Sequence, residues 1–371
     1  MNISVNYYSS DAIDALKCRY NMIIGERSNG KTYNLLTKIV KNYAKNGKQG
    51  AYVRRWKEDY RGKRGSQLFA ALEANDEISQ LTGGMYTRTK YYNGRWWLAN
   101  YDAKLDKLVT APEPLCFAFA LSDMEHDKGI SYPQITTIVF DEFLTRGYYL
   151  PNEFVLFQNC ISTIVRHRTD VTIYMLANTV NKFSIYFKEM GIKRIEEMKQ
   201  GSIDVYKYGD SDMRVAVEYC SPMAKENKLE NSYFAFDNPA LNMITEGTWE
   251  LDLYPHAPEN WKQKREHVVE YFIIYFNGHK IQCDIIEAEI EGEWCSFLYC
   301  HERTYDITDL DEKLVFSDVQ SVKPNWFMNL RKPANDYCRR CGSFFKNENV
   351  YYQDNEVGDV IMNYLQWCAK H

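Results

Sequence analysis

The chain has 371 residues and a mass of 43.7 kDa, with 45% hydrophobic and 26% charged residues. This length predicts two or three domains, and the composition excludes an intrinsically disordered chain. A formal net charge of −5 excludes a globally basic nucleic-acid coat but leaves room for a local basic channel. The longest apolar run, residues 115–121, is far shorter than the ~20 residues of a membrane-spanning helix. The N-terminal residues lack a secretory signal pattern, so the ten cysteines are expected to be reduced thiols in a cytoplasm.

Predicted strands and helices alternate through the first 200 residues. Residues 20–24 form a short apolar strand, and residues 31–44 have apolar side chains at helical spacing. Asn93-Gly94 predicts a hairpin over residues 90–97, because this pair readily adopts two positive φ angles. Apolar strands separated by helices are typical of an α/β domain with a mostly parallel sheet covered on both faces. The other predicted elements are strands at 51–53, 116–121, 136–140 and 171–176 and helices at 66–81 and 154–166.

The pattern changes after residue 200. Residues 201–231 are rich in charge and are predicted to form a linker with some helix. Three apolar segments, 268–276, 280–290 and 294–300, are separated by turns and predict an antiparallel meander. A helix over 356–368 closes the chain. The predicted organisation is therefore a domain at 1–200, a linker at 201–231 and a smaller α+β domain at 232–371.

Residues 25–32 read Gly-Glu-Arg-Ser-Asn-Gly-Lys-Thr and fit the pattern G-x-x-x-x-G-K-[ST] between a predicted strand and a predicted helix. The two glycines let backbone N–H groups turn toward phosphate oxygens, and the helix N-terminus adds a partial positive charge. Lys31 is expected to reach the β- and γ-phosphates, and the Thr32 hydroxyl to bind Mg²⁺. The alternative is a glycine-rich turn without a ligand. The predicted nucleotide-binding residues are Gly25, Glu26, Arg27, Ser28, Asn29, Gly30, Lys31, Thr32 and Asn178.

Two acids follow the apolar strand 136–140. Asp141 is expected to hold the hydration shell of Mg²⁺, and Glu142 to polarise a water for attack on the γ-phosphate. Asn178 follows the next strand, where its amide is expected to sense the γ-phosphate. The alternatives are a solvated strand end for the two acids and a turn cap for Asn178.

Several arginines are candidates for charge stabilisation. Arg146 lies four residues beyond Glu142 and is either an arginine finger in trans or a solvated side chain, with Arg166 and Arg168 as rival fingers. Arg27 either adds charge over the phosphates or forms a salt bridge within the loop.

Six basic residues lie between positions 54 and 64, interleaved with Trp56 and Tyr60. They predict either a nucleic-acid channel or a solvated charged loop. A further alternative places Arg54 and Arg55 beside the nucleotide.

The loop at 25–32, together with segments 140–143, 149–153, 164–166 and 176–178, resembles the DNA-encapsidation ATPases of small tailed phages that replicate by protein priming. Those proteins are ring-shaped packaging motors related to large terminases, within the additional-strand (ASCE) P-loop NTPases. The resemblance covers roughly residues 15–190 and also fits the total length. It implies an ATPase that translocates double-stranded DNA into a preformed prohead and hydrolyses ATP at the subunit interfaces of a homomeric ring, expected to be a pentamer.

The same resemblance implies the binding partners of the chain, its location and the roles of its site residues. The partners are double-stranded DNA, the portal (connector) protein, a prohead RNA and further copies of the chain, with no membrane. The expected location is the host cytoplasm, transiently at the portal vertex of the prohead. Lys31, Glu142 and Arg146 take catalytic roles, Thr32 and Asp141 hold Mg²⁺, and Asn178 contacts ATP.

Related terminases carry an RNase H-like nuclease, and the predicted meander looks like the start of that fold. Such a nuclease needs carboxylates on its first strand to hold two metal ions. Residues 268–276 have only Glu270, near the strand edge, and Asp284, Glu287 and Glu289 of the next strand are expected to face outward. The domain is therefore predicted to be nuclease-inactive and to grip nucleic acid or the portal. The basic residues predicted for this contact are Lys262, Lys264, Arg265, Lys280 and Arg331.

Three alternatives stay open from the sequence. The chain is another ASCE DNA translocase or helicase, a terminase with residual nuclease activity, or a nucleotide-binding assembly factor without turnover.

Overall fold

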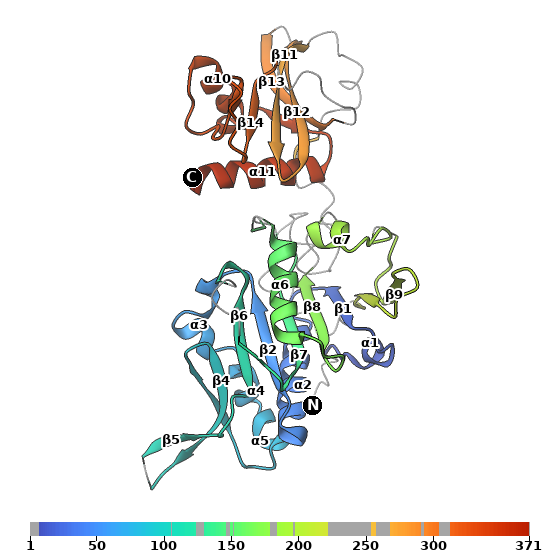
Figure 1. The fold of residues 1–371 in the computed structure, drawn as a ribbon, viewed down its shortest axis with the longest axis vertical. Helices are drawn as coiled ribbons and strands as arrows, with labels where there is room; N and C mark the ends of the chain where they lie inside the picture. Colours follow the sequence, from blue (N-terminus) through green and yellow to red (C-terminus); the bar gives the residue numbers. More distant parts are fainter. Residues whose placement is uncertain are drawn as a thin grey trace. The chain divides into compact units, whose positions relative to one another are not determined.

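The computed structural model describes residues 7–104, 106–123, 130–145, 149–150, 152–178, 184–195, 197–221, 254–256, 268–290, 293–303 and 312–370. The chain divides into two compact units (Figure 1). The first unit comprises Met1–Thr145 and Asn152–Trp249, and the second comprises Arg146–Pro151 and Glu250–His371. Among the described helices, none has the length and apolar character needed to cross a membrane.

The first unit is built on a ten-stranded sheet with the order β3-β4-β6-β2-β7-β8-β1-β10-β9, and β5 pairs with β4. The neighbours from β6 to β10 along this order are parallel, whereas β3, β4, β5 and β9 pair antiparallel. The predicted α/β fold with a central, mostly parallel sheet is confirmed. The strands are β1 (Tyr20–Gly25), β2 (Gln49–Arg54), β3 (Arg88–Tyr92), β4 (Arg95–Asp102), β5 (Lys107–Thr110), β6 (Cys116–Ala120), β7 (Ile135–Asp141), β8 (Thr172–Asn178), β9 (Ser202–Lys207) and β10 (Arg214–Tyr219).

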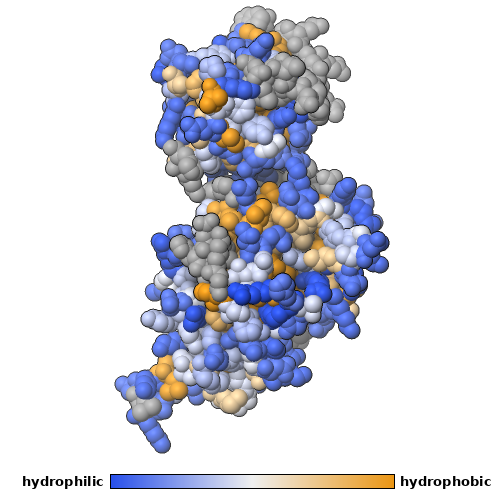
Figure 2. Space-filling model, viewed as in Figure 1, coloured by the Kyte–Doolittle hydropathy of each residue, from blue (hydrophilic) through white to orange (hydrophobic). Residues whose placement is uncertain are grey.

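Helices cover both faces of this sheet, as alternation along β7 shows. Val139 belongs to the core that also contains the buried face of α2 (Lys31–Asn46), whereas the next residue, Phe140, stacks on Phe157 of α6 (Glu153–Val165) at 5.0 Å between ring centroids. Apolar residues also gather at the surface over α6 (Figure 2). The other helices of the unit are α1 (Asp11–Ala15), η1 (Lys57–Tyr60), α3 (Lys63–Ser66), α4 (Ala70–Ala74), α5 (Glu77–Leu81) and α7 (Ile185–Glu189).

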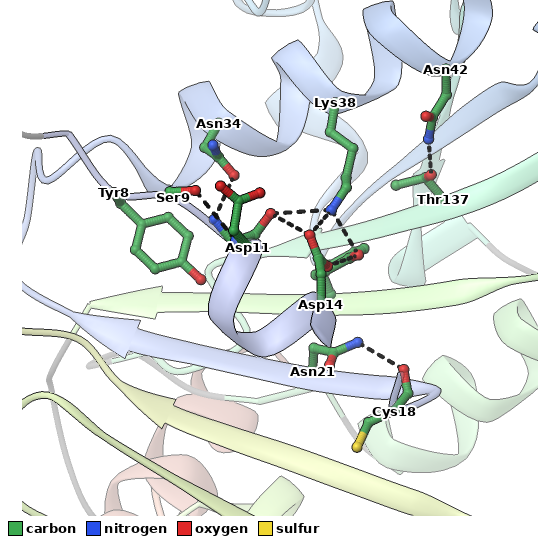
Figure 3. A network of polar contacts seen from close by, with 12 residues as sticks. Tyr8, Ser9, Asp11, Asp14, Cys18, Asn21, Asn34, Lys38, Asn42 and Thr137 are labelled. Atoms are coloured by element: carbon green, nitrogen blue, oxygen red, sulfur yellow. Dashed lines mark hydrogen bonds and ion pairs between the residues drawn. The ribbon is translucent and has the colours of Figure 1, made fainter. Parts of the chain in front are cut away.

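A polar network fastens the N-terminal helix α1 to the rest of the first unit (Figure 3). The Lys38 ammonium of α2 contacts the Asp14 carboxylate, and it also donates to the Ser10 hydroxyl at 3.1 Å and to the Tyr174 hydroxyl of β8 at 3.2 Å. The Asn34 side chain accepts from the Ser10 N–H at 3.2 Å. The segment that precedes β1 is therefore held against the first turns of α2, which follow the glycine loop.

Two predicted elements of the first unit are wrong in part. Residues 66–81 do not form one helix, because Asp76 adopts a left-handed conformation with φ +55° that separates α4 from α5. The segment 201–231 is not simply a linker, since β9 and β10 extend the sheet beside β1. The reason is that Val215, Ala216 and Val217 are buried, although the apolar run is only three residues long.

The second unit contains a six-stranded sheet with the order β15-β14-β11-β12-β13-β16. The predicted antiparallel meander is confirmed, with Asn277 and Gly278 at φ +49° and +83° in its first turn. Phe272, Cys283 and Leu298 pack with helices α10 and α11 in one core. The elements are β11 (Val268–Phe276), β12 (His279–Ile290), β13 (Glu293–Glu302), β14 (Val315–Ser317), β15 (Trp326–Phe327), β16 (Val350–Tyr352), α10 (Asp336–Lys346) and α11 (Asn355–Lys370).

Candidate active site

The loop between β1 and α2 is shaped by two glycines that have little room for a side chain. Gly30 caps α2 at φ +93°, and a Cβ atom there would lie 3.1 Å from the ring of Tyr7. A Cβ atom on Gly25 would lie 2.7 Å from the Cβ of Cys220, closer than real Cβ contacts allow. Ser28 also has a positive φ, +64°. This compact loop leaves the first N–H groups of α2 at the surface of a cavity.

The Lys31 side chain is folded onto the loop itself. Its ammonium donates to the carbonyl of Glu26 at 2.7 Å, to the side-chain oxygen of Asn29 at 3.0 Å and to the carbonyl of Gly25 at 3.3 Å. Burial lowers the pKa of this amine, while the nearby Asp141 acts in the opposite direction. An anion in the cavity would therefore stabilise the charged form of Lys31.

Thr32 and Asp141 meet where α2 begins and β7 ends. The Thr32 hydroxyl donates to the Asp141 carboxylate at 3.2 Å, and the Tyr52 hydroxyl donates to the same carboxylate oxygen. Oxygen ligands of this kind, one hydroxyl and one carboxylate, are those that Mg²⁺ accepts in proteins beside its own waters. The pair therefore fits a Mg²⁺ site at this edge of the sheet.

Glu142 is held by its neighbour Arg54 at the end of β2. The Arg54 guanidinium donates to the Glu142 carboxylate at 2.8 Å and lies 3.6 Å from Asp141 and 3.4 Å from Asp59. Burial opposes the charge on Arg54, but Tyr52, Asp141 and Glu142 around it raise its pKa. Glu142 itself has a left-handed backbone with φ +58°. A residue that rarely adopts this conformation does so here beside the cavity, as is common at functional sites.

Asn178 completes the group from a third strand. It is the last residue of β8, which lies between β1 and β7, and it pairs in register with Gly25. The structure thus brings Lys31, Thr32, Asp141 and Glu142 together with Asn178 around a cavity of about 640 Å³. The cavity is lined by Tyr7, Arg27, Ser28, Asn29, Gly30, Lys31, Thr32, Tyr33, Ala71, Asn75, Glu77, Asp141, Glu142, Ala177 and Asn178.

Comparison with known proteins identifies the family. The Podovirus DNA encapsidation protein (Gp16) family matches residues 1–207, which is more than half of the chain. The chain belongs to this family. The family expected from the sequence is thereby confirmed.

Two curated DNA packaging proteins are similar in sequence to part of this chain. The DNA packaging protein of Bacillus phage B103 is 29% identical over 175 residues, which cover 46% of this chain and 48% of that protein. The DNA packaging protein of Bacillus phage phi29 is 30% identical over 170 residues, which cover 45% of each chain. The chain therefore spans about half the length of the curated relatives it matches.

The fold is similar over a longer stretch than the sequence. A chain in the solved structure described as the Phi-28 gp11 DNA packaging motor matches with a TM-score of 0.56 and 17% identity, and the match covers 99% of both chains. A second such structure, the bacteriophage Phi-29 viral genome packaging motor assembly, has the same TM-score and identity and covers 97% of this chain. At this identity the likeness concerns the fold alone.

In this member of the encapsidation family the predicted arginines have different environments. Arg27 is exposed at the cavity and makes no salt bridge with the residues that the structure describes. Arg168 donates to backbone carbonyls that include Ile135, at 2.6 Å, whereas Arg166 donates to the carbonyl of Ile130 at 2.8 Å and is exposed. The favoured finger, Arg146, lies outside the described residues, and so do Lys262, Lys264 and Arg265.

The basic stretch between residues 54 and 64 is largely ion-paired within the chain. Arg55 is buried and binds Glu153, Lys57 binds Asp123 at 2.6 Å, and Arg61 lies 3.5 Å from Glu58. Neither Arg54 nor Arg55 lines the cavity, but both contact the strand-end acids, because Arg54 binds the Glu142 carboxylate and Arg55 binds the carbonyls of Glu142 and Phe143. Sequence reasoning missed their partners, because the acids that they bind lie 88 and 98 residues away.

One acid of the second unit differs from the expectation, and the side chain of Glu289 lies outside the described residues. Asp284 does not face outward. It is 8% exposed and lies 3.1 Å from the Nε2 of His301 on the neighbouring strand. Glu287 is bound to Arg340 at 3.1 Å, and Glu270 is exposed. The described residues contain no group of three or more His, Cys, Asp or Glu side chains placed to hold a metal ion.

Proposed function

We propose that this chain is an ATPase whose ATP hydrolysis drives double-stranded DNA into a preformed prohead. The single observation that carries the hydrolysis is the convergence of a phosphate-binding loop, a cation, a Mg²⁺-type oxygen pair and a general base on one cavity. These groups and Asn178 come from three separate stretches of the sequence, near residues 31, 141 and 178.

Each group has a role that its position supports. The triphosphate of ATP lies in the glycine loop, where Lys31 leaves the loop carbonyls to bind the β- and γ-phosphates. Thr32 and Asp141 hold Mg²⁺, directly or through its waters. Glu142 accepts a proton from the attacking water, and Arg54 orients that carboxylate. Asn178 is placed to report whether the γ-phosphate is present.

The strand order supports the additional-strand class of P-loop NTPases. In this sheet β8 lies between β1, which leads into the loop, and β7, which ends in the two acids. Asn178 at the end of that inserted strand therefore lies between loop and acids. A residue there can contact the γ-phosphate between the loop and the acids. Such a contact suits a motor that must couple loss of that phosphate to movement.

The DNA-moving role is supported by family membership and by the second unit. The curated relatives are named DNA packaging proteins. In the second unit, β13-β12-β11 are antiparallel, while β14 and β15 follow β11 in parallel, which is the order expected for an RNase H-like sheet. We infer an RNase H-like domain without cleavage that grips nucleic acid. The proposed partners remain DNA, the portal protein, a prohead RNA and copies of the chain in a ring, acting at the portal vertex.

Replacing Glu142 by Gln tests the hydrolysis. The amide cannot accept the proton of water, so we expect kcat for ATP to fall by ~10²–10⁴-fold while the Kd for Mg-ATP stays within a few-fold. Glu58→Gln changes an exposed carboxylate in the same way and should leave both constants unaltered. An unchanged rate in Glu142→Gln would exclude Glu142 as the general base, whereas a parent chain that binds Mg-ATP without turnover would leave only a nucleotide-binding assembly factor. Stimulation by proheads with portal, rather than by DNA ends alone, separates a packaging motor from a helicase.

A further inference from the structure

Arg55 forms a buried ion pair beneath the candidate site. Its guanidinium follows β2 and is 7% exposed, and it binds the fully buried Glu153 through two parallel bonds of 2.7 and 2.9 Å. Glu153 is the first residue of α6, and it also accepts from the Tyr186 hydroxyl of α7 at 2.7 Å. One cluster therefore ties the end of β2 to the beginnings of two helices.

The same guanidinium reaches the backbone around the proposed base. It donates to the carbonyl of Glu142 at 3.2 Å and to the carbonyl of Phe143 at 2.9 Å. The Phe143 N–H donates to the carbonyl of Leu176 in β8 at 3.2 Å. The peptide after Glu142 is thus held from two sides, by Arg55 and by β8.

This peptide needs to be held because Glu142 is strained. Its φ of +58° lies in the left-handed region that L side chains rarely adopt, so the conformation persists only where surrounding contacts fix it. Arg54, the residue before Arg55, binds the carboxylate of Glu142, whereas Arg55 binds the backbone carbonyl of Glu142. Two successive residues of one strand end therefore act on the side chain and on the backbone of the same glutamate.

We propose that Arg55 is a positioning residue for ATP hydrolysis, which keeps Glu142 in its left-handed conformation with the carboxylate at the cavity. This inference rests on the proposed function of Glu142 as general base. Arg55 does not line the cavity, so its effect on the reaction passes through Glu142. Removing Arg55 should therefore change the rate of the chemical step and not the binding of nucleotide.

A double substitution separates positioning from stability. Replacing Arg55 and Glu153 together by Met removes both charges and keeps a similar volume. Such a replacement of a buried ion pair often preserves the stability of the protein. The carbonyls of Glu142 and Phe143 then lose their donor. We expect kcat to fall at least tenfold, with KM and the Kd for Mg-ATP within about twofold of the parent chain and a similar Tm. A folded double variant with unchanged kcat would overturn the proposal.

Glu153→Gln is the matched control. It keeps the Arg55 guanidinium and its two carbonyl bonds, so kcat should stay close to that of the parent chain. If kcat instead falls as far as in the double variant, the proposal that Arg55 acts through its two carbonyl bonds is overturned. A parent chain that neither binds nor hydrolyses ATP would contradict the proposed function, which is a separate outcome.

Arg55→Lys keeps the proposal testable if the double variant does not fold. A lysine keeps the charge beside Glu153 but lacks the planar fork that serves the carboxylate and the carbonyls together. Hydrogen exchange at the Phe143 amide should become faster while Mg-ATP binding is retained and kcat falls. Exchange and kcat that both stay at parent values would overturn the proposal.

Discussion

Tyr7 and Tyr33 give the candidate site an aromatic wall. Their rings lie 6.4 Å apart between centroids with planes 25° from parallel, and both line the cavity. The Tyr33 hydroxyl donates to Glu77 at 3.3 Å and accepts from the Asn75 amide at 3.3 Å. A flat aromatic ring stacks on a purine, and a carboxylate accepts from ribose hydroxyls. We infer that this wall holds the nucleoside part of ATP.

Replacing Tyr7 by Ala should weaken the binding of Mg-ATP roughly tenfold, because one stacking face is lost. Inorganic tripolyphosphate has no base and should bind equally well to both forms, which makes it the comparison ligand. Tyr92→Ala removes an exposed tyrosine of β3 and serves as the control. Calorimetry with both ligands decides the matter. An equal loss for ATP and tripolyphosphate would show instead that Tyr7 shapes the loop by packing on Gly30.

Among the elements, β10 approaches the glycine loop more closely than the sequence indicates. The Cys220 N–H donates to the carbonyl of Ile24 at 2.8 Å, immediately after β10 and beside the end of β1. The side chain of Cys220 fills the space in which a Cβ atom of residue 25 would lie. Gly25 is therefore required by the packing of two neighbouring strands as well as by the turn toward phosphate.

Gly25→Ala should destabilise the fold by about 1–3 kcal/mol, because the added methyl group overlaps Cys220. Thermal unfolding and the binding of Mg-ATP should both be impaired. The double variant Gly25→Ala, Cys220→Gly removes the overlapping Cβ atom and should recover both, relative to Cys220→Gly alone. If the double variant is as impaired as Gly25→Ala, the close contact with β10 is not the reason for the glycine.

Elements with a local signal could be predicted, and elements defined by distant partners could not. The loop at 25–32, the two strand-end acids and the Asn93-Gly94 hairpin each depend on neighbouring residues, and the structure forms all three. By contrast, β10 is a strand because it pairs with β1, which lies nearly 200 residues earlier in the sequence. Asp76 breaks a helix by adopting a left-handed conformation that its neighbours in sequence do not require. Helical periodicity in residues 66–81 gave no sign of that break.

The candidate site shows the same division. Lys31, Thr32, Asp141, Glu142 and Asn178 were predicted from patterns, and the sheet brings them together because parallel strands end at one edge. The ion pairs of Arg54 and Arg55 were not predicted, because a basic stretch does not reveal which of its members have buried partners. Asp284 was misassigned for a related reason, since His301 on the adjacent strand pairs with it.

At the scale of the whole molecule, the described residues of the first unit leave the candidate site open to water. The Glu142 side chain is 57% exposed, and Arg27 is exposed at the cavity. Charge developing on a γ-phosphate is poorly stabilised in such a solvated site, because water screens the protein groups. A neighbouring copy that covers the cavity would exclude water and supply a further cation. This is the physical reason to propose a ring with the site at the subunit interface.

The candidate fingers differ in how readily a neighbour can receive them. Arg168 has carbonyl partners from β7 and α6, including Ile135 and Ile164, so its guanidinium is engaged within its own subunit. Arg166 is exposed, and its side chain donates to the carbonyl of Ile130. The geometry therefore ranks Arg166 ahead of Arg168 as a rival to Arg146.

Mixing two inactive variants tests whether Arg146 acts in trans. Arg146→Ala subunits keep Glu142, and Glu142→Ala subunits keep Arg146, so an interface between them in one order has both groups. Random mixing in equal amounts should make about a quarter of the interfaces complete in a closed ring. We expect ATP hydrolysis to rise well above that of either variant alone, with native mass measurement showing that the rings are mixed. Mixed rings without recovery would exclude Arg146 in trans, and the same mixing with Arg166→Ala would then locate the finger, since only a residue contributed across the interface is restored by a neighbour.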